Sequence, residues 1–402
     1  MKVVQLNCVY GNGSTGKIVE AIHHHLQSEG DESYVLYGYG PDSCESHAIR
    51  VVPPAIRKAQ SLRSRITGYP YGGAIWGTAS TISFLNKIKP DVVHIHCYNA
   101  YIANIYRILS YLKREHIPTV ITNHAEFMYT GGCTYSLQCN KWLNGCGGCN
   151  KIGNEHPVSW FFDRTHSEWE RLCKAYEGFD DLTICCVSDW VRDRAARSPF
   201  FQGHQVLTVL NGLDSSVFKY RFNEELRNRL ANNGRRKVVL HVTPDFSNPI
   251  KGGQHVLEMA KRMPDVSFVV VGNRGGVITE LGNILFAGRA DDQIALAEYY
   301  SAADVCLLTS KAETYSMVTA ESLCCGTPVV GFRAGGPETI AIPEFSVFVP
   351  QQNDSALEKQ LLQFATASFC KEDISVTARK KYSDVRMCSN YRQIYLESCN
   401  GC

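Results

Sequence analysis

The 402-residue sequence has no long apolar run and no large excess of charge of either sign. No stretch approaches the ~18 apolar residues of a membrane-spanning helix, and the short run after Lys2 is interrupted by Gln5 and Asn7. That run is a poor match to the apolar region of a secretory signal peptide, so we expect a cytoplasmic protein. The net charge of +2 predicts no general attraction to nucleic acid.

The cysteines do not fit a closed disulfide framework. There are 17, an odd number, and several lie inside apolar runs such as ICCV at 184–187 and LCCG at 323–326. Cysteines in such runs are typical of reduced, buried thiols in a cytosolic protein.

Short β-rich runs alternate with helical patterns along most of the chain. The runs include VVQLNCV, DVVHIHC and LTICCVS in the first half, and KVVLHV, SFVVVG and PVVGF in the second. Such apolar strands, separated by helices, are typical of a parallel sheet covered on both faces. The pattern therefore predicts an α/β protein with two parallel-sheet domains.

The changes of pattern along the chain predict where these domains begin and end. We expect a first domain at 1–195, a second at 196–372, and a helical segment at 373–402 that packs back on the first domain. A loop-like segment rich in Gly, Cys and Trp, at about 127–167, is interpreted as an insertion in the first domain.

The glycine-rich loop YGNGSTGKIVEAI, at 10–22, comes close to two phosphate-binding patterns. A P-loop needs Ser or Thr after its lysine to bind Mg²⁺, and this chain has Ile18. A dinucleotide-binding turn needs a carboxylate at the end of the next strand, which here ends LYGYG at 36–40. What remains is a set of backbone amides, from Gly11 through Gly13 to Gly16, at the carboxyl edge of a parallel sheet. Ligands of such folds bind at that edge.

The most informative stretch is SKAETYSMVTAESLCCGTPVVGFRAGGPETI, at 310–340. If a helix begins near Ser316, Glu313 lies in the loop before it and Glu321 lies within its second turn. Two carboxylates then face one crevice, with helix-terminal amides between them that suit an anion. The alternative is that both glutamates decorate an exposed helix.

This stretch resembles the retaining glycosyltransferases of family 4, which have the GT-B fold and a characteristic pair of glutamates separated by seven residues. The resemblance extends to KPDVVHIH at 89–96, VLNGLD at 209–214 and KGG at 251–253, in the expected order. It implies two Rossmann-like domains that face each other across a cleft. It also implies a nucleotide-diphosphate sugar, a UDP- or GDP-sugar, as the donor.

The resemblance also implies roles in donor binding. Glu321 would bind the ribose hydroxyls, and Glu313 the hydroxyls of the transferred sugar. Lys251 would contact the diphosphate, where a cation stabilises the leaving group. The family usually has an arginine several residues before this lysine, and this chain has none there. Either Lys251 works with less help, or another basic group, such as Arg289, covers the phosphate. The remaining candidates on the donor side are the helix-terminal residues Ser316, Met317 and Val318 and the VLNGLD residues Asn211 and Gly212.

In the first domain the resemblance points to His124, which follows the strand run TVITN. It implies a contact with the sugar or the acceptor, while a structural histidine is the alternative. The usual aspartate after this histidine is replaced by Ala125, followed by Glu126. The implied reaction retains the anomeric configuration and requires neither a protein nucleophile nor a metal cofactor. The loop of Gly11, Gly13 and Gly16 would line the same cleft.

The insertion contains four cysteines in GGCTYSLQCNKWLNGCGGCN. A CxxC pair with two upstream cysteines is one way to build a tetrahedral structural zinc site. Packed thiols and disulfides are the alternatives. The four candidates are Cys133, Cys139, Cys146 and Cys149.

One segment contains basic residues interleaved with apolar ones, and such a segment can lie on an anionic membrane surface. A membrane contact would suit a lipid-linked acceptor. The basic residues of the segment are Arg57, Lys58, Arg63 and Arg65. A solvated helix face is the alternative. The family members that this chain most resembles assemble bacterial surface polysaccharides, colanic acid, O-antigen and capsule among them, which implies a polyprenyl-diphosphate-linked saccharide acceptor. The other functions considered are a sugar-nucleotide 2-epimerase of GT-B fold and a non-catalytic sugar-nucleotide-binding protein.

Overall fold

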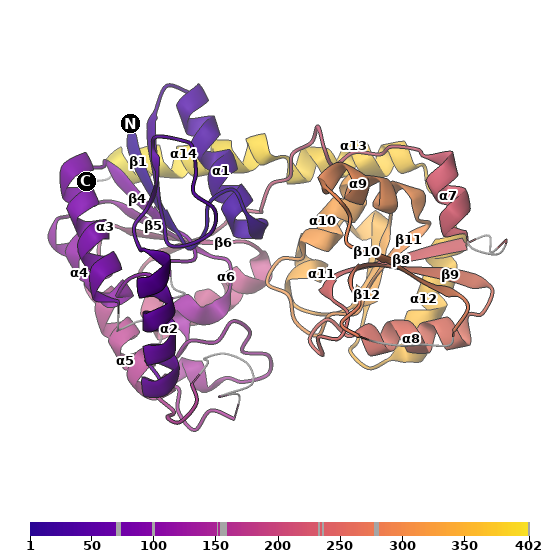
Figure 1. The fold of residues 1–402 in the computed structure, drawn as a ribbon, viewed down its shortest axis with the longest axis horizontal. Coiled ribbons are helices and arrows are strands. Elements are labelled where there is room, and N and C mark those ends of the chain that lie inside the picture. Colours follow the sequence, from indigo (N-terminus) through magenta and orange to yellow (C-terminus); the bar gives the residue numbers. More distant parts are fainter. Residues whose placement is uncertain are drawn as a thin grey trace. The chain divides into compact units, whose positions relative to one another are not determined.

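The computed structural model describes residues 1–69, 74–98, 101–150, 152, 159–231, 234, 237–276 and 281–400. The chain divides into two compact domains. The first domain consists of two segments, Met1–Leu210 and the part of the chain from Met387 onward. The second domain runs from Asn211 to Arg386 (Figure 1).

The first domain contains a seven-stranded sheet in which every neighbouring pair of strands is parallel, in the order β3-β2-β1-β4-β5-β6-β7. Its strands are β1 (Lys2–Asn7), β2 (Glu32–Tyr37), β3 (Ala48–Arg50), β4 (Val92–Ile95), β5 (Thr119–Asn123), β6 (Leu182–Cys186) and β7 (Gln205–Thr208). Its helices are α1 (Gly13–Ser28), α2 (Pro54–Thr67), α3 (Ile75–Ile88), α4 (Ile105–Arg114), α5 (Thr165–Tyr176) and α6 (Asp189–Ala195), with 3₁₀ turns η1 (Glu126–Tyr129), η2 (Lys141–Leu143) and η3 (Pro199–Phe201).

The last helix, α14 (Asp384–Asn400), completes the core of the first domain. Tyr391 and Tyr395 of α14 and Ile22 of α1 pack on strand residues such as Val3 and Val120. These helices therefore cover one face of the first sheet with residues from opposite ends of the chain.

The second domain contains a six-stranded parallel sheet in the order β10-β9-β8-β11-β12-β13. Its strands are β8 (Lys237–Asp245), β9 (Val266–Asn273), β10 (Ile284–Gly288), β11 (Val305–Leu308), β12 (Val329–Phe332) and β13 (Ser346–Val349). Its helices are α7 (Glu224–Leu230), α8 (Gly253–Arg262), α9 (Gln293–Ala302), α10 (Met317–Cys324), α11 (Gly336–Ile340), α12 (Asp354–Thr366) and α13 (Lys371–Tyr382), with the 3₁₀ turn η4 (Pro343–Phe345).

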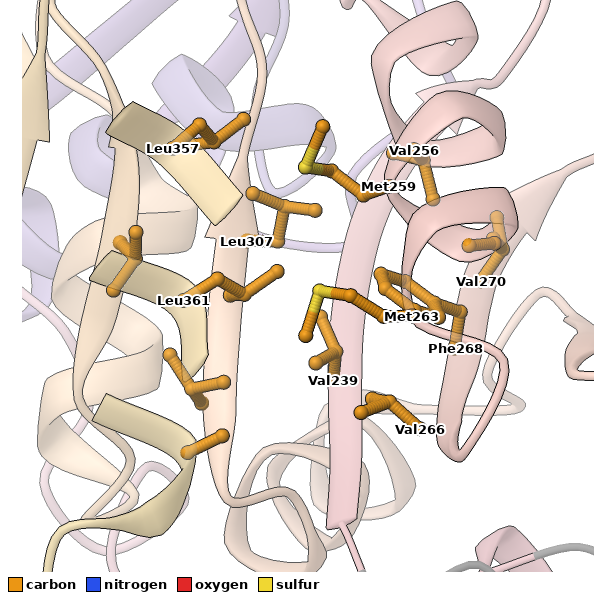
Figure 2. Close-up of a cluster of buried hydrophobic side chains, with 14 of the residues drawn as sticks. Val239, Val256, Met259, Met263, Val266, Phe268, Val270, Leu307, Leu357 and Leu361 are labelled. Carbon is orange, nitrogen blue, oxygen red and sulfur yellow. The ribbon is translucent and has the colours of Figure 1, made fainter. Parts of the chain in front are cut away.

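One face of the second sheet is covered by α8 and α12. Met259 of α8 and Leu361 of α12 pack with Val239, Phe268 and Leu307 of the strands in one buried cluster (Figure 2). Burial of such side chains, at about 25 cal/mol per Å² of apolar surface, drives the helices onto the sheet. No described helix is long and apolar enough to cross a membrane.

The division of the chain differs from the expected one at two places. The first domain extends past residue 195 to Leu210, because β7 pairs with β6 and completes the first sheet. The final segment also splits, since α13 stays with the second domain, where the Ser375 hydroxyl donates to the Cys324 carbonyl at 2.6 Å. Only the part from Met387 onward joins the first domain.

Candidate active site

Lys251 lies in the loop that follows β8, the longest strand of the second sheet. Its amide donates to the Asn248 carbonyl at 2.9 Å, and its carbonyl accepts from Thr309 Oγ1 at 2.9 Å. The next residue, Gly252, has a φ of 70° and lies so close to Thr309 that a Cβ would be 2.2 Å from its carbonyl oxygen. Only glycine fits both conditions, and the contact fixes Lys251 beside the end of β11.

Glu313 is held by the backbone on both of its sides. Its N–H donates to the Ala334 carbonyl at 2.9 Å, and its carbonyl accepts from the Gly336 N–H at 2.8 Å. Its side chain is 13% exposed, and Oε1 lies 2.6 Å from Lys251 Nζ, so the two residues form an ion pair. The structure thus brings together a cation that follows β8 and a carboxylate that follows β11.

Close to Glu313 in the chain, Ser316 begins α10, as the sequence predicts. Ser316 has a φ of 82°, and its hydroxyl accepts the Thr319 amide at 3.2 Å. As at every helix N-terminus, the first amides have no acceptor within the helix and carry partial positive charge. Here these amides belong to Met317 and Val318.

Glu321 lies on α10, and its carboxylate is oriented by a tyrosine. The Tyr300 hydroxyl on α9 donates to Glu321 Oε2 at 2.9 Å. Burial, and then the Glu321 charge, hold the pKa of Tyr300 well above its ordinary value, so that its hydroxyl stays a donor. The sequence reasoning missed Tyr300, although it lies in the stretch AEYYSAAD, which precedes the glutamates.

Asn211 is tied to the residue before Ser316. The Tyr315 hydroxyl donates to the Asn211 carbonyl at 2.7 Å, and Gly212 follows directly in the chain. The Oδ1 atom of Asn211 is buried and has no hydrogen-bond partner among the described residues. An unpaired buried carbonyl is costly, so this group is available to a ligand donor.

His241 is a further polar residue beside Lys251 that the sequence reasoning did not single out. It is buried on β8, with Nδ1 3.0 Å from the Leu307 carbonyl oxygen. Burial, with a contribution from the Lys251 charge, lowers the pKa of His241 to about 4. His241 is therefore neutral at physiological pH, and its signal in the sequence was a polar residue inside the apolar run KVVLHV.

Arg289 lies after β10, the edge strand of the second sheet. Its side chain is exposed and lines a polar depression of about 440 Å³ together with Arg229, Glu298 and Tyr299. Neither Lys251 nor Glu313 lines this depression. That Arg289 covers the donor phosphate in place of the missing arginine stays a prediction.

In the first domain, His124 follows β5 and belongs to a chain of buried polar groups. Its Nε2 lies 3.0 Å from His96 Nδ1, and burial lowers the pKa of His124 to about 4. The ring centroid of His94 lies 3.7 Å from that of His96, with the rings tilted by 39°, and His94 Nδ1 lies 2.6 Å from the Tyr395 hydroxyl. This network connects the end of β5 to α14 through neutral imidazoles.

The glycine loop has the backbone that its sequence suggests. Gly11 and Gly13 have φ values of 64° and 66°, and α1 begins at Gly13. A Cβ on Gly11 would lie 2.9 Å from a carboxylate oxygen of Glu20. Gly16 is buried in α1, where its carbonyl accepts the Gly11 amide at 3.2 Å.

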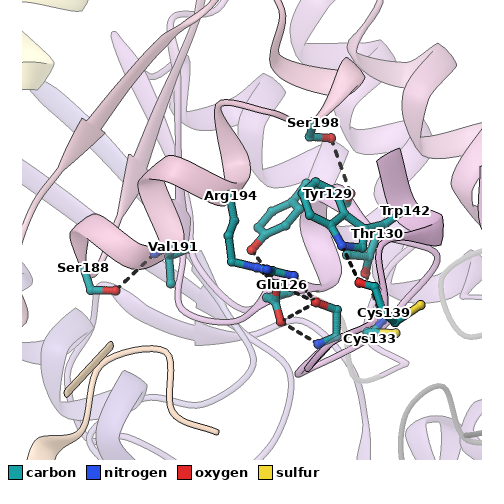
Figure 3. Close-up of polar contacts among 11 residues, drawn as sticks. Glu126, Tyr129, Thr130, Cys133, Cys139, Trp142, Ser188, Val191, Arg194 and Ser198 are labelled. Carbon is teal, nitrogen blue, oxygen red and sulfur yellow. Dashed lines mark hydrogen bonds and ion pairs between the residues drawn. The ribbon is translucent and has the colours of Figure 1, made fainter. Parts of the chain in front are cut away.

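Glu126 is a buried anchor of the insertion. It is inaccessible to solvent and accepts bonds from Arg194 Nε at 2.7 Å, the Tyr129 hydroxyl at 2.9 Å and the Ser136 backbone N–H at 2.5 Å (Figure 3). The Arg194 guanidinium also lies 5.0 Å from the centre of a Trp142 ring. Because these protein groups occupy the carboxylate, Glu126 does not replace the missing aspartate as a ligand group.

The four cysteines of the insertion are free thiols. Among the described residues, which include all four, no group of three or more His, Cys, Asp or Glu side chains lies close enough to hold a metal ion. Cys146 Sγ accepts the Gly131 amide at 3.2 Å, and burial raises the pKa of its thiol to about 11. The four-cysteine site is thus not assembled here, and zinc stays a prediction for metal analysis of freshly purified protein to test.

Comparison with known protein families identifies the chain. A model described as Glycosyltransferase Family 4 matches residues 15–217, just over half of the sequence. The chain belongs to glycosyltransferase family 4. A second model, for glycosyl transferases group 1, matches residues 236–367 of this family 4 enzyme, which include Lys251, Glu313 and Glu321. Membership of this family favours a glycosyltransferase over the two alternative functions, the sugar-nucleotide epimerase and the non-catalytic sugar-nucleotide-binding protein.

Known relatives of this family 4 enzyme match it over different lengths. A putative colanic acid biosynthesis glycosyl transferase, WcaC, of Escherichia coli is 20% identical over 98% of this chain and 99% of its own. The sulfoquinovosyl transferase of Arabidopsis thaliana is 32% identical over 65% of this chain and 46% of its own.

Solved structures confirm the predicted GT-B fold of two Rossmann-like domains. A sucrose-phosphate synthase from Thermosynechococcus elongatus superposes with a TM-score of 0.70 at 16% identity, covering 100% of both chains. The Anabaena protein HepE in complex with UDP superposes with a TM-score of 0.65 at 15% identity, covering 99% of this chain and 100% of its own.

Proposed function

We propose that this family 4 glycosyltransferase transfers a sugar, with retention at the anomeric carbon, from a UDP- or GDP-sugar to a saccharide acceptor. The observation that carries the proposal is the ion pair between Lys251 and Glu313 next to the start of α10. Structures of HepE with UDP and with UDP-glucose favour UDP as the first nucleotide to test.

Each donor-side residue has a role that follows from its chemistry. Lys251 neutralises the diphosphate, and Glu313 accepts hydrogen bonds from hydroxyls of the transferred sugar. Glu321, oriented by the Tyr300 hydroxyl, binds the ribose hydroxyls. The amides at the start of α10 bind sugar or phosphate oxygens, and the unpaired Asn211 Oδ1 accepts a donor hydrogen.

The chemistry proposed for this site relies on orientation and charge. As the anomeric bond breaks, negative charge grows on the leaving diphosphate, which Lys251 and the α10 amides stabilise. A phosphate oxygen of the leaving group takes the proton of the incoming hydroxyl, so that neither a protein nucleophile nor a metal cofactor is required. In the first domain, His124 and the Gly11–Gly16 loop contact the sugar or the acceptor.

The acceptor we propose is a polyprenyl-diphosphate-linked saccharide of bacterial surface polysaccharide assembly, used at the cytoplasmic face of the membrane. The relative WcaC, which matches nearly the whole chain and is named for colanic acid biosynthesis, supports this assignment.

The proposal is tested by donor binding and donor turnover. The melting temperature is first measured with a panel of UDP- and GDP-sugars, since ligand bound to the folded state raises it. Hydrolysis or transfer of the stabilising donor is then compared between wild type and Glu313→Ala. Stabilisation by one donor, with turnover lost in the variant, is expected. No stabilisation by any donor, or equal turnover in the variant, would refute the proposed site.

A further inference from the structure

The first domain has an exposed apolar surface made of two segments far apart in the sequence. One is a face of α2 with Leu62 and Ile66, and the other is the run Trp160-Phe161-Phe162. These five side chains are 42% to 69% exposed and make up five of the twelve exposed large hydrophobic residues in the described part of the chain. We call the two segments together the α2–aromatic surface.

The two segments are in direct contact. The Trp160 backbone N–H donates to the Arg65 carbonyl, in the last turn of α2, at 2.8 Å. At the end of α2, Gly68 has a φ of 75°, and a Cβ there would lie 2.8 Å from the Phe162 carbonyl oxygen. The aromatic run is thus fixed against the C-terminal end of α2, whose position in the first domain is seen in Figure 1.

Leu62 and Ile66 lie one helical turn apart and share a face of α2. Lys58, one turn earlier, is also exposed, whereas Gln60 and Ser64 face inward. The helix therefore presents Lys58, Leu62 and Ile66 to the outside and Gln60 and Ser64 to the domain. This is the reverse of the usual surface helix, which buries its apolar stripe.

The charge around this surface is positive. The α2 sequence PAIRKAQSLRSRIT contains four basic residues and no acidic one. At the aromatic run, the Arg164 guanidinium lies 5.3 Å from the centre of the Phe162 ring. The neighbouring Asp163 carboxylate accepts the Cys149 amide and the Thr165 hydroxyl, each at 2.7 Å.

Exposed tryptophan and phenylalanine beside lysine and arginine match the chemistry of an anionic bilayer surface. Aromatic rings enter the boundary between headgroups and acyl chains, while basic side chains are attracted to anionic lipid headgroups. A sugar-binding platform would instead combine flat rings with carboxylate or amide acceptors. A contact between two copies of this surface would bring like charges together.

We propose that the α2–aromatic surface is the site at which the first domain binds an anionic lipid bilayer. The inference deepens the proposed function, because a lipid-linked acceptor must be reached at a membrane. Binding itself requires neither donor nor acceptor, so the two proposals fail separately.

Co-sedimentation with vesicles tests the proposal, with phosphatidylcholine vesicles compared with vesicles that also contain phosphatidylglycerol. We expect the full chain to bind the anionic vesicles and to be partly released by salt. Phe161→Ala should weaken binding by about tenfold, since the variant loses the burial of one aromatic ring in the bilayer. The matched control is Phe222→Ala, which removes a phenylalanine of similar exposure from the second domain (65% against 69%).

The charge is tested in the same assay by the double variant Lys58→Glu and Arg63→Glu. Its control, Lys359→Glu with Lys380→Glu, makes the same change in net charge on exposed residues of α12 and α13. We expect the first pair to abolish binding and the second to leave most of it. Equal loss in both pairs, or in both phenylalanine variants, would overturn the proposal.

Two further outcomes would also overturn the proposal. One is wild-type protein that does not bind the anionic vesicles. The other is that wild type sediments as a dimer, and that Phe161→Ala dissociates this dimer without changing vesicle binding. That result would assign the surface to contact with a second copy of the chain. Donor hydrolysis by Phe161→Ala should equal that of wild type. Vesicle binding without any donor turnover would therefore refute the proposed function and leave this inference standing.

Discussion

Lys251 and Glu313 form an ion pair in the second domain, with Nζ 2.6 Å from Oε1. In the proposed reaction the lysine contacts the diphosphate and the glutamate contacts the sugar. A bound donor must therefore replace the interaction that each residue makes with the other. This relationship gives the two residues opposite effects on nucleotide binding.

Glu313→Gln should bind UDP several-fold more tightly than wild type and yet lose transfer. Removing the carboxylate leaves the Lys251 charge free for the diphosphate, while the sugar loses a charged acceptor that positions it. Lys251→Ala should weaken UDP binding and lower kcat by about 10²–10³-fold, as expected when a group that stabilises developing charge is removed. Calorimetry with UDP and steady-state transfer rates measure the two effects. UDP binding that changes in the same direction in both variants would contradict these roles.

Tyr300→Phe should raise the Kd of the donor with little effect on kcat. The change removes the hydroxyl that donates to Glu321 Oε2 at 2.9 Å and leaves the buried ring in place. A hydrogen bond to a charged group contributes about 1.5–3 kcal/mol, so we expect a tenfold or larger rise in Kd. Tyr299→Phe, at the neighbouring position that lines the depression of Arg289, is the control and should bind the donor as wild type does.

The sequence predicted the fold and the places of Glu313 and Glu321 relative to a helix start, because both depend on local patterns. Apolar strand runs predict parallel sheets, and the spacing of Glu313 and Glu321 places them on either side of a helix start. The position of Arg289 could not be predicted, because it depends on the order of strands in the sheet, which puts β10 at the edge. The exposure of Phe161 could not be predicted, since an aromatic run in a loop has the same sequence whether it is buried or not.

The partners of Glu126 were also hidden in the sequence. Arg194 lies 68 residues away along the chain, and only the packing of α6 against the start of the insertion brings it there. Arg194 therefore has a structural role, and the effect of replacing it can be compared with the effect of replacing a nearby arginine on the same helix.

Arg194→Ala should destabilise the first domain by about 3–5 kcal/mol, because it leaves the carboxylate of Glu126 buried and unpaired. Arg192→Ala is the matched control on α6. Its partners Asp189 and Asp193 are 48% and 67% exposed, and exposed pairs contribute about 1 kcal/mol or less. All five tryptophans lie before residue 210, so tryptophan fluorescence during urea unfolding reports the first domain. Equal losses in the two variants would contradict the anchoring role.

Glu168, buried on α5, should make the stability of the first domain fall as the pH rises. Burial raises the pKa of Glu168 from its ordinary 4.5 to about 7, and the Tyr106 hydroxyl and Arg171 only partly oppose this shift. Its Oε1 has no hydrogen-bond partner among the described residues. Between pH 4.5 and 7 the folded state therefore binds more protons than the unfolded state, so the free energy of unfolding decreases with rising pH.

Glu168→Gln, which cannot ionise, should lack this decrease. Relative to wild type, the free energy of unfolding of the variant should rise by on the order of 3 kcal/mol between pH 4.5 and pH 8, at about 1.4 kcal/mol per unit of pKa shift. The buried histidines with lowered pKa values, such as His124, have the opposite dependence but contribute equally to both proteins. Glu170→Gln, on the same helix with a 60% exposed carboxylate, should keep the wild-type slope. Parallel curves for wild type and Glu168→Gln would show that Glu168 is already ionised in the folded protein at the acidic end of the range.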